Sequence, residues 1–182
     1  LYGLYFAVLG AFVPYWGLYL KTAGYSSAEI GQIMAIVMGT KILAPNLWAW
    51  LTNHTGRGLA LIRLATAMAA LIFAGVFLVG EYWPLAVVMA GYSFFWHAVL
   101  PQFEVLTLDH LGPSRAHRYG RIRLWGSIGF ILAVAGLGPL LAGFDIALLP
   151  MVVLALLAAL AIMSWTLPAA PGKRATRRRR CR

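Results

Sequence analysis

Among the residues that can carry a charge inside long apolar segments, four are candidates for chemistry. Glu104 and His97 belong to one such segment, Arg123 to the next, and Lys41 to an earlier one. A charge inside a membrane-spanning helix costs several kcal/mol, so it is normally paired, faces a cavity or has a function. These residues are therefore candidates for binding or coupling sites within a membrane.

Glu104 and Arg123 lie at comparable depth. Glu104 is expected about one turn inside the end of the fourth apolar segment, and Arg123 about one turn inside the same end of the fifth. An ion pair between them is geometrically plausible, because a short loop joins the two antiparallel segments. A carboxylate suits coupling to protons, and arginine suits an anionic or hydroxyl-rich substrate. The alternatives are a structural salt bridge, or an Arg123 that snorkels to the lipid headgroups.

Lys41 and His97 are the other candidates. Lys41 lies about twelve residues into the second apolar segment, too deep to snorkel comfortably, so it should face a cavity or a carboxylate. A structural pairing remains the alternative. His97 precedes Glu104 by seven residues, which places both on one helical face. It is either a proton relay or hydrogen-bond donor, or a packed neutral histidine.

The composition indicates that lipid is the solvent for much of the chain. Of 182 residues, 62% are hydrophobic and only 11% are charged, whereas a soluble domain carries about 25% charged residues. Six apolar segments are long enough to cross a hydrocarbon core of about 30 Å as helices. They cover residues 1–20, 29–51, 59–80, 83–108, 119–142 and 145–167.

The distribution of basic residues predicts the orientation. The second and fourth breaks between segments, with the segment ends beside them, contain six arginines, and the last ten residues contain seven more basic residues, which makes 13 of the 15 Lys and Arg. The positive-inside rule then places both chain ends in the cytoplasm. The six arginines are Arg57, Arg63, Arg115, Arg118, Arg121 and Arg123.

Two domains are predicted: a transmembrane bundle over 1–167, and a basic cytoplasmic tail over 168–182 that binds anionic lipid or controls topology rather than binding nucleic acid. Cys181, in that tail, is the only cysteine, so no disulfide forms within the chain. No catalytic motif and no metal-ligand spacing is present, and we expect no enzyme activity, cofactor or metal. The sequence opens on Leu1 without Met, and we expect a trimmed or incomplete N-terminus rather than a signal peptide.

Small residues recur at helical spacing in two segments, and such faces let membrane helices approach closely. The first segment carries Gly3, Ala7, Gly10, Pro14 and Gly17, and the fifth carries Gly126, Gly129, Ala133 and Gly136. We interpret both faces as packing surfaces rather than ligand sites.

Five stretches give a family resemblance: residues 10–16, 40–46, 100–104, 108–112 and 119–130. Through them the chain resembles the N-terminal half of a major facilitator superfamily transporter. It is most similar to the branch that contains phenylpropionate permease-like and lactose permease-like proton symporters. The resemblance implies an all-α fold in which six transmembrane helices form one half, as a 3+3 repeat.

The resemblance also implies roles for individual residues. In lactose permease-like proteins, the glutamate of Pro-x-x-Glu and the second arginine of Gly-Arg-x-Arg contact substrate, and these positions are Glu104 and Arg123 here. A Gly-x-x-x-Asp-x-x-Gly-Arg loop helps to gate the cytoplasmic side in the superfamily. Gly56 and Arg57 of that motif remain, but Asn53 replaces the aspartate and removes its charge from gating.

Transporters of this superfamily have twelve spans, with the substrate site between two six-helix halves. The resemblance therefore implies half of a proton-coupled secondary transporter in the cytoplasmic (inner) membrane. The expected substrate is a small organic solute, first an aromatic carboxylate and second a sugar or nucleoside. A second half or a second copy would supply the opposite wall of the site. Residues 168–182 are then either a basic cytoplasmic tail or the loop between the two halves. The alternative is a truncated six-helix membrane module that does not transport.

Overall fold

The computed structural model describes residues 1–111 and 119–167, except for the side chains of Asp109 and His110. Within these ranges, six helices are long and apolar enough to cross a membrane, as predicted. They lie within a few residues of the expected bounds. The helices are α1 (Tyr2–Thr22), α2 (Ser27–Thr55), α3 (Gly58–Ala74), continued by η1 (Gly75–Leu78), α4 (Tyr82–Leu111), α5 (Tyr119–Gly143), and α6 (Leu149–Trp165), preceded by η3 (Ile146–Leu148).

Three calls from the sequence fall outside these ranges. The basic tail 168–182, Cys181 in that tail, and the loop arginines Arg115 and Arg118 all lie beyond the described residues.

Local side chains explain where α2 begins and ends. The Ser26 hydroxyl accepts a hydrogen bond from the Glu29 backbone N–H, while the Glu29 carboxylate accepts one from the Ser26 backbone N–H at 2.8 Å. This capping box satisfies two amide groups that the helix leaves unpaired. At the other end Gly56 adopts a left-handed conformation with φ of 64°, which glycine takes at little cost. The turn into α3 follows directly.

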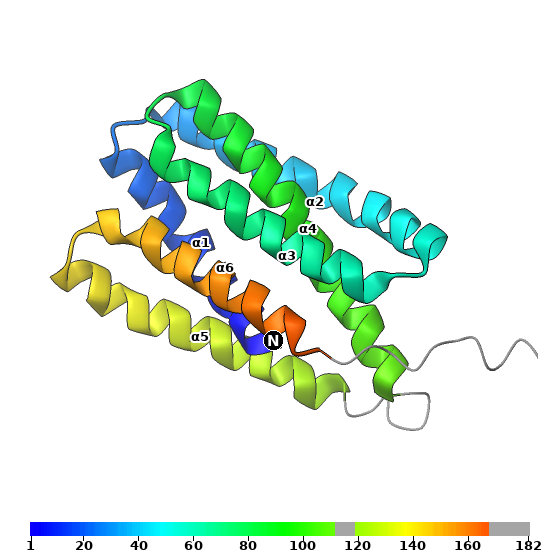
Figure 1. Cartoon of the computed structure of the whole chain (residues 1–182). Helices are drawn as coiled ribbons and strands as arrows, with labels where there is room; N and C mark the ends of the chain where they lie inside the picture. Colours follow the sequence, from blue (N-terminus) through cyan, green and yellow to red (C-terminus); the bar gives the residue numbers. More distant parts are fainter. Residues whose placement is uncertain (112–118, 168–182) are drawn as a thin grey trace, which may run out of the picture.

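The six helices run side by side, with α2 and α5 at opposite margins of the bundle (Figure 1). The main contacts pair α1 with α5 and α4 with α2, and likewise α3 with α4 and α6 with α1. Exchanging helices α1–α3 for α4–α6 therefore reproduces the same pairs. Because α1 and α4 enter the bundle from opposite ends, this is the pattern of an inverted three-helix repeat.

Most of the described charges lie near the two ends of the bundle. Arg57, Arg63, Arg121 and Arg123 lie on the end that contains the α2–α3 turn, the end of α4 and the start of α5. We call this the basic end. The opposite end carries Lys21, Glu29, Glu81 and Asp145. The assignment of the basic end to the cytoplasm remains a prediction from the positive-inside rule.

Glycines bring α1 and α5 into very close contact. A Cβ atom built on Gly129 would overlap the backbone of Gly3, and one on Gly10 would lie 2.8 Å from the Phe130 carbonyl oxygen. A Cβ atom on Gly126 would lie 2.6 Å from the Phe6 ring. The predicted small-residue faces are thus packing surfaces. Gly136 is not part of them, because a Cβ atom there would meet nothing within 4 Å.

Helices α1 and α4 are connected by aromatic side chains instead. Tyr5 of α1 stacks on Trp96 of α4 with ring centroids 4.2 Å apart, and Tyr5 also contacts Phe103 edge-on. Further along α1, Phe12 contacts Tyr92 at 5.6 Å. All of these rings are buried. Large rings at this interface keep the two backbones apart and fill the centre of the bundle.

Arg63 of α3 holds the end of α6. Its guanidinium donates hydrogen bonds to the carbonyl oxygens of Ser164, Trp165 and Leu167 at 3.2–3.3 Å, and it lies over the Trp165 ring at 5.0 Å. The last carbonyls of a helix have no partner within the helix, and a cation there is favourable. The sequence interpretation had used Arg63 only as a marker of orientation.

The outer faces of α2 and α5 are apolar and exposed. Ile42 and Leu43 are 72% and 71% exposed, and Ile131 and Leu132 are 62% and 67% exposed. Exposed patches of this kind on a water-soluble monomer would promote association. In a bilayer they contact lipid or another helix, which agrees with the composition.

We expect Gly129→Ala to destabilise the bundle by about 1–3 kcal/mol, because the added methyl forces α5 away from α1. Gly136→Ala is the matched control on the same helix, and we expect it to change stability by less than about 0.5 kcal/mol. Thermal unfolding of the two purified variants in detergent measures the difference. Equal melting temperatures for both variants would contradict the proposed contact.

Candidate functional site

Glu104 and Arg123 are brought together by the ends of α4 and α5. Helix α4 continues to Leu111, so Glu104 lies seven residues, or about 10 Å, from its end. This is about two turns inside the helix rather than the expected one, because the helix extends beyond the predicted limit of residue 108. Arg123 lies one turn after the start of α5 at Tyr119.

The two side chains form an ion pair. Arg123 Nη1 lies 3.2 Å from Glu104 Oε1, and the same oxygen accepts a hydrogen bond from the Tyr119 hydroxyl at 2.9 Å. Arg123 Nη1 also lies 3.4 Å from the Tyr119 hydroxyl. The side chain of Arg123 is 53% exposed and that of Glu104 is 32% exposed. Both side chains are therefore partly accessible on the described bundle.

Tyr119 is a member of this group that the sequence interpretation did not select. It precedes Arg123 by four residues, and this spacing places the two side chains on one helical face. The spacing was available in the sequence, but a tyrosine near the end of a membrane helix is usually explained by the interfacial belt. Its hydroxyl instead bonds to Glu104.

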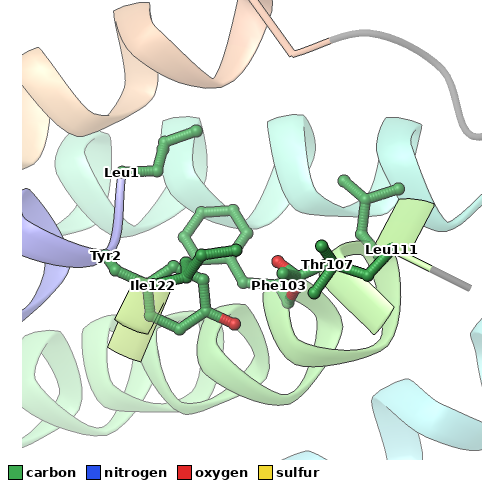
Figure 2. A pocket seen from close by; sticks show the side chains of 7 residues that line it. Leu1, Tyr2, Phe103, Thr107, Leu111 and Ile122 are labelled. Atoms are coloured by element: carbon green, nitrogen blue, oxygen red, sulfur yellow. Dashed lines mark hydrogen bonds between the residues drawn. The ribbon is translucent and has the colours of Figure 1, made fainter. Parts of the chain in front are cut away.

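An apolar pocket of about 270 Å³ lies beside this group (Figure 2). Most of its lining is apolar. The Thr107 hydroxyl donates to the Phe103 carbonyl oxygen at 2.7 Å. The pocket therefore suits apolar groups rather than specific polar recognition. It is lined by Leu1, Tyr2, Phe103, Leu106, Thr107, Leu111 and Ile122.

His97 precedes Glu104 by seven residues on α4, and it contacts α2 rather than Glu104. Its Nδ1 atom lies 3.1 Å from Thr40 Oγ1, which is also 2.8 Å from Ser93 Oγ. Ser93 is fully buried and His97 is partly buried. The structure thus places His97 in a hydrogen-bonded group between two helices.

Lys41 follows Thr40 on α2 and is exposed, next to Ile42 and Leu43. Among the side chains that the structure describes, no carboxylate lies within ion-pair distance of its ammonium. The structure therefore does not supply the structural pairing that was one of the two interpretations of this residue.

The residues predicted to gate the cytoplasmic side form the α2–α3 turn. Asn53, Gly56 and Arg57 are all exposed there. Next to the turn, α2 is connected to α4 by Thr52, whose hydroxyl donates to Gln102 Oε1 at 2.9 Å. Gln102 is 5% exposed and lies two residues before Glu104 on α4. The sequence interpretation missed this link.

The part of the chain that the structure describes contains no cluster of three or more histidines, cysteines or carboxylates that could hold a metal ion.

The whole described bundle matches known membrane transporters. The family model "MFS_1 like family" matches residues 1–180. The chain is 34% identical over 138 residues to maltose permease of Geobacillus stearothermophilus, covering 75% of this chain and 35% of that protein. It is 31% identical over 148 residues to a probable 3-phenylpropionic acid transporter of Escherichia coli (strain K12), covering 79% of this chain and 38% of that protein.

A solved structure supports the same fold. The crystal structure of the nucleoside transporter NupG superposes with a TM-score of 0.85 over 96% of this chain and 44% of that chain, at 21% identity. At this identity the match concerns the fold. The chain spans less than two fifths of the length of the two curated relatives. These proteins are permeases and transporters rather than enzymes.

We expect a double-mutant cycle of Glu104→Gln and Arg123→Gln to give a coupling energy of about 0.5–1 kcal/mol, because both side chains are partly exposed and solvent screens the pair. Thermal unfolding of the two single variants and the double variant in detergent measures it. Fully additive effects would contradict the observed ion pair.

Proposed function

The chain belongs to the MFS_1-like family of major facilitator transporters, and on that premise we propose that it forms half of a secondary transporter for a small organic solute. It is a multi-pass membrane protein with six spanning helices. The basic end would face the cytoplasm, since the arginines there follow the positive-inside rule. We propose that the membrane is the cytoplasmic (inner) membrane.

The observation that carries the proposal is the group formed by Glu104, Tyr119 and Arg123. A carboxylate and a guanidinium in a membrane helix stabilise each other while the site is empty. A substrate with hydroxyl or carboxylate groups can replace one of these hydrogen bonds, because both side chains are partly exposed. In this proposal Arg123 binds the substrate, and Glu104 binds it or accepts a proton.

The names of the similar proteins span the solute classes that we propose. One carries maltose in its name, one 3-phenylpropionic acid, and one nucleosides. An aromatic carboxylate is our first candidate for this chain, and a sugar or nucleoside is the second. Arginine is compatible with each of them, since it binds carboxylates and hydroxyl-rich solutes.

The transporter would need a second wall. Secondary transporters of this kind bind substrate between two six-helix units and alternate by rocking one against the other. We propose that a second half or a second copy of the chain covers part of the apolar surface of α2 and α5. Proton coupling is part of the proposal, because Glu104 is a carboxylate that can be either paired or protonated.

The test is uptake of radiolabelled solutes by the full natural chain in proteoliposomes, with and without an imposed pH gradient. We expect Glu104→Gln and Arg123→Ala each to lower uptake by roughly tenfold or more, because a hydrogen bond to a charged group contributes about 1.5–3 kcal/mol. Glu81→Gln, an exposed carboxylate at the opposite end, is the control and should transport normally.

Unchanged uptake in both site variants would overturn the site. Solute accumulation that does not depend on the pH gradient would overturn proton coupling and leave the site assignment unaffected. No uptake of any tested organic acid, sugar or nucleoside would favour a six-helix module that does not transport.

A further inference from the structure

One face of α4 contributes to two separate polar groups, one around His97 and one around Glu104. Ser93, His97 and Glu104 follow at intervals of four and seven residues, which keeps all three on the same side of the helix. His97 and Glu104 are about 10 Å apart along the helix axis. A small solute of moderate length can therefore contact both groups at once.

Thr40 and Ser93 fix the histidine ring. Thr40 Oγ1 lies within hydrogen-bond distance of Ser93 Oγ, of the Val37 carbonyl oxygen and of His97 Nδ1. Ser93 in turn donates to the Ala90 carbonyl oxygen at 3.2 Å. Since His97 Nδ1 is engaged with Thr40 in either tautomer, the ring Nε2 atom is directed away from Thr40.

The two groups differ in net charge. Arg123 is compensated by Glu104 at 3.2 Å. Lys41 has no carboxylate at ion-pair distance among the described side chains, and it directly follows Thr40, whose hydroxyl lies 3.1 Å from His97 Nδ1. The Glu104–Arg123 pair is therefore neutral, whereas Lys41 on α2 adds an uncompensated positive charge beside the group of His97. An isolated ammonium near the middle of a membrane is costly, so it calls for an anion.

We propose that Lys41 and His97 bind the carboxylate of an organic acid, while the rest of that substrate extends along α4 to Glu104 and Arg123. This inference rests on the proposed function and narrows its substrate class to organic monoacids. Sugars and nucleosides lack the anion that this position requires. The carboxylate would accept hydrogen bonds from the lysine ammonium and, depending on tautomer or charge, from the histidine ring.

The test compares a charged probe with a neutral one of the same shape. Binding of 3-phenylpropionate and of 3-phenylpropionamide to the purified full natural chain is measured by calorimetry. We expect the acid to bind at least roughly tenfold more tightly than the amide, and Lys41→Gln to remove most of that preference. Lys41→Arg should keep it, because the charge remains.

Lys21→Gln is the matched control, since Lys21 is an exposed lysine at the far end of α1. It should leave both affinities unchanged. Thr40→Val should weaken binding of the acid more than Thr40→Ser, which retains the hydroxyl. Melting temperatures of all variants confirm that each is folded.

Equal affinities of acid and amide for the unmodified protein would overturn the inference, and so would an acid that does not bind. An equal loss of both ligands in Lys41→Gln would assign Lys41 to a carboxylate of the protein instead. If Glu104→Gln and Arg123→Ala abolish uptake while Lys41→Gln leaves acid affinity intact, this inference fails and the proposed function stands.

Discussion

The close contact between α1 and α5 determines where Arg123 lies. Helices α4 and α5 make little backbone contact with each other, so α4 alone does not hold Arg123 next to Glu104. Gly3 and Gly129 let α1 and α5 approach until no side chain fits between them. Tyr5 and its aromatic neighbours set the spacing of α1 from α4. The ion pair is thus the product of one tight interface and one wide interface, and both include α1.

The lipid environment explains why polar groups gather at so few places. Backbone groups in the hydrocarbon region must be satisfied within helices, so side chains alone can provide binding groups there. In the described bundle, Ser93, His97 and Glu104 lie on one face of α4, whereas Gln102 of the same helix bonds to Thr52 of α2. The outer faces of α2 and α5 carry large apolar residues instead. A single face with two polar groups is a suitable lining for a solute pathway between two bundles.

Much of the fold could be predicted from the sequence, because it depends on local patterns. These patterns are long apolar segments, capping residues at helix ends and small residues at helical spacing. The six helices, the capping box at Ser26 and the packing faces at Gly3 and Gly129 all follow from such local patterns. The pairing of Glu104 with Arg123 was also predictable, since two opposite charges rarely stay apart in adjacent membrane helices.

Other features depend on distances between helices that are far apart in sequence. The bond from Tyr119 to Glu104, the link from Thr52 to Gln102 and the cap of α6 by Arg63 required the arrangement of the whole bundle. A tyrosine and an arginine near helix ends have a common interfacial explanation, and a threonine there has no distinctive pattern. Nothing in their local sequence distinguishes that role from a tertiary contact.

Chemical cross-linking tests most directly whether α1 positions the site. Cysteines replace Glu104 and Arg123 in a Cys181→Ser background, and a short dimaleimide reagent joins them in membranes. The structure predicts efficient cross-linking that falls sharply when Gly129→Ala is added and persists when Gly136→Ala is added. Equal cross-linking with both glycine substitutions, or none in their absence, would contradict the account.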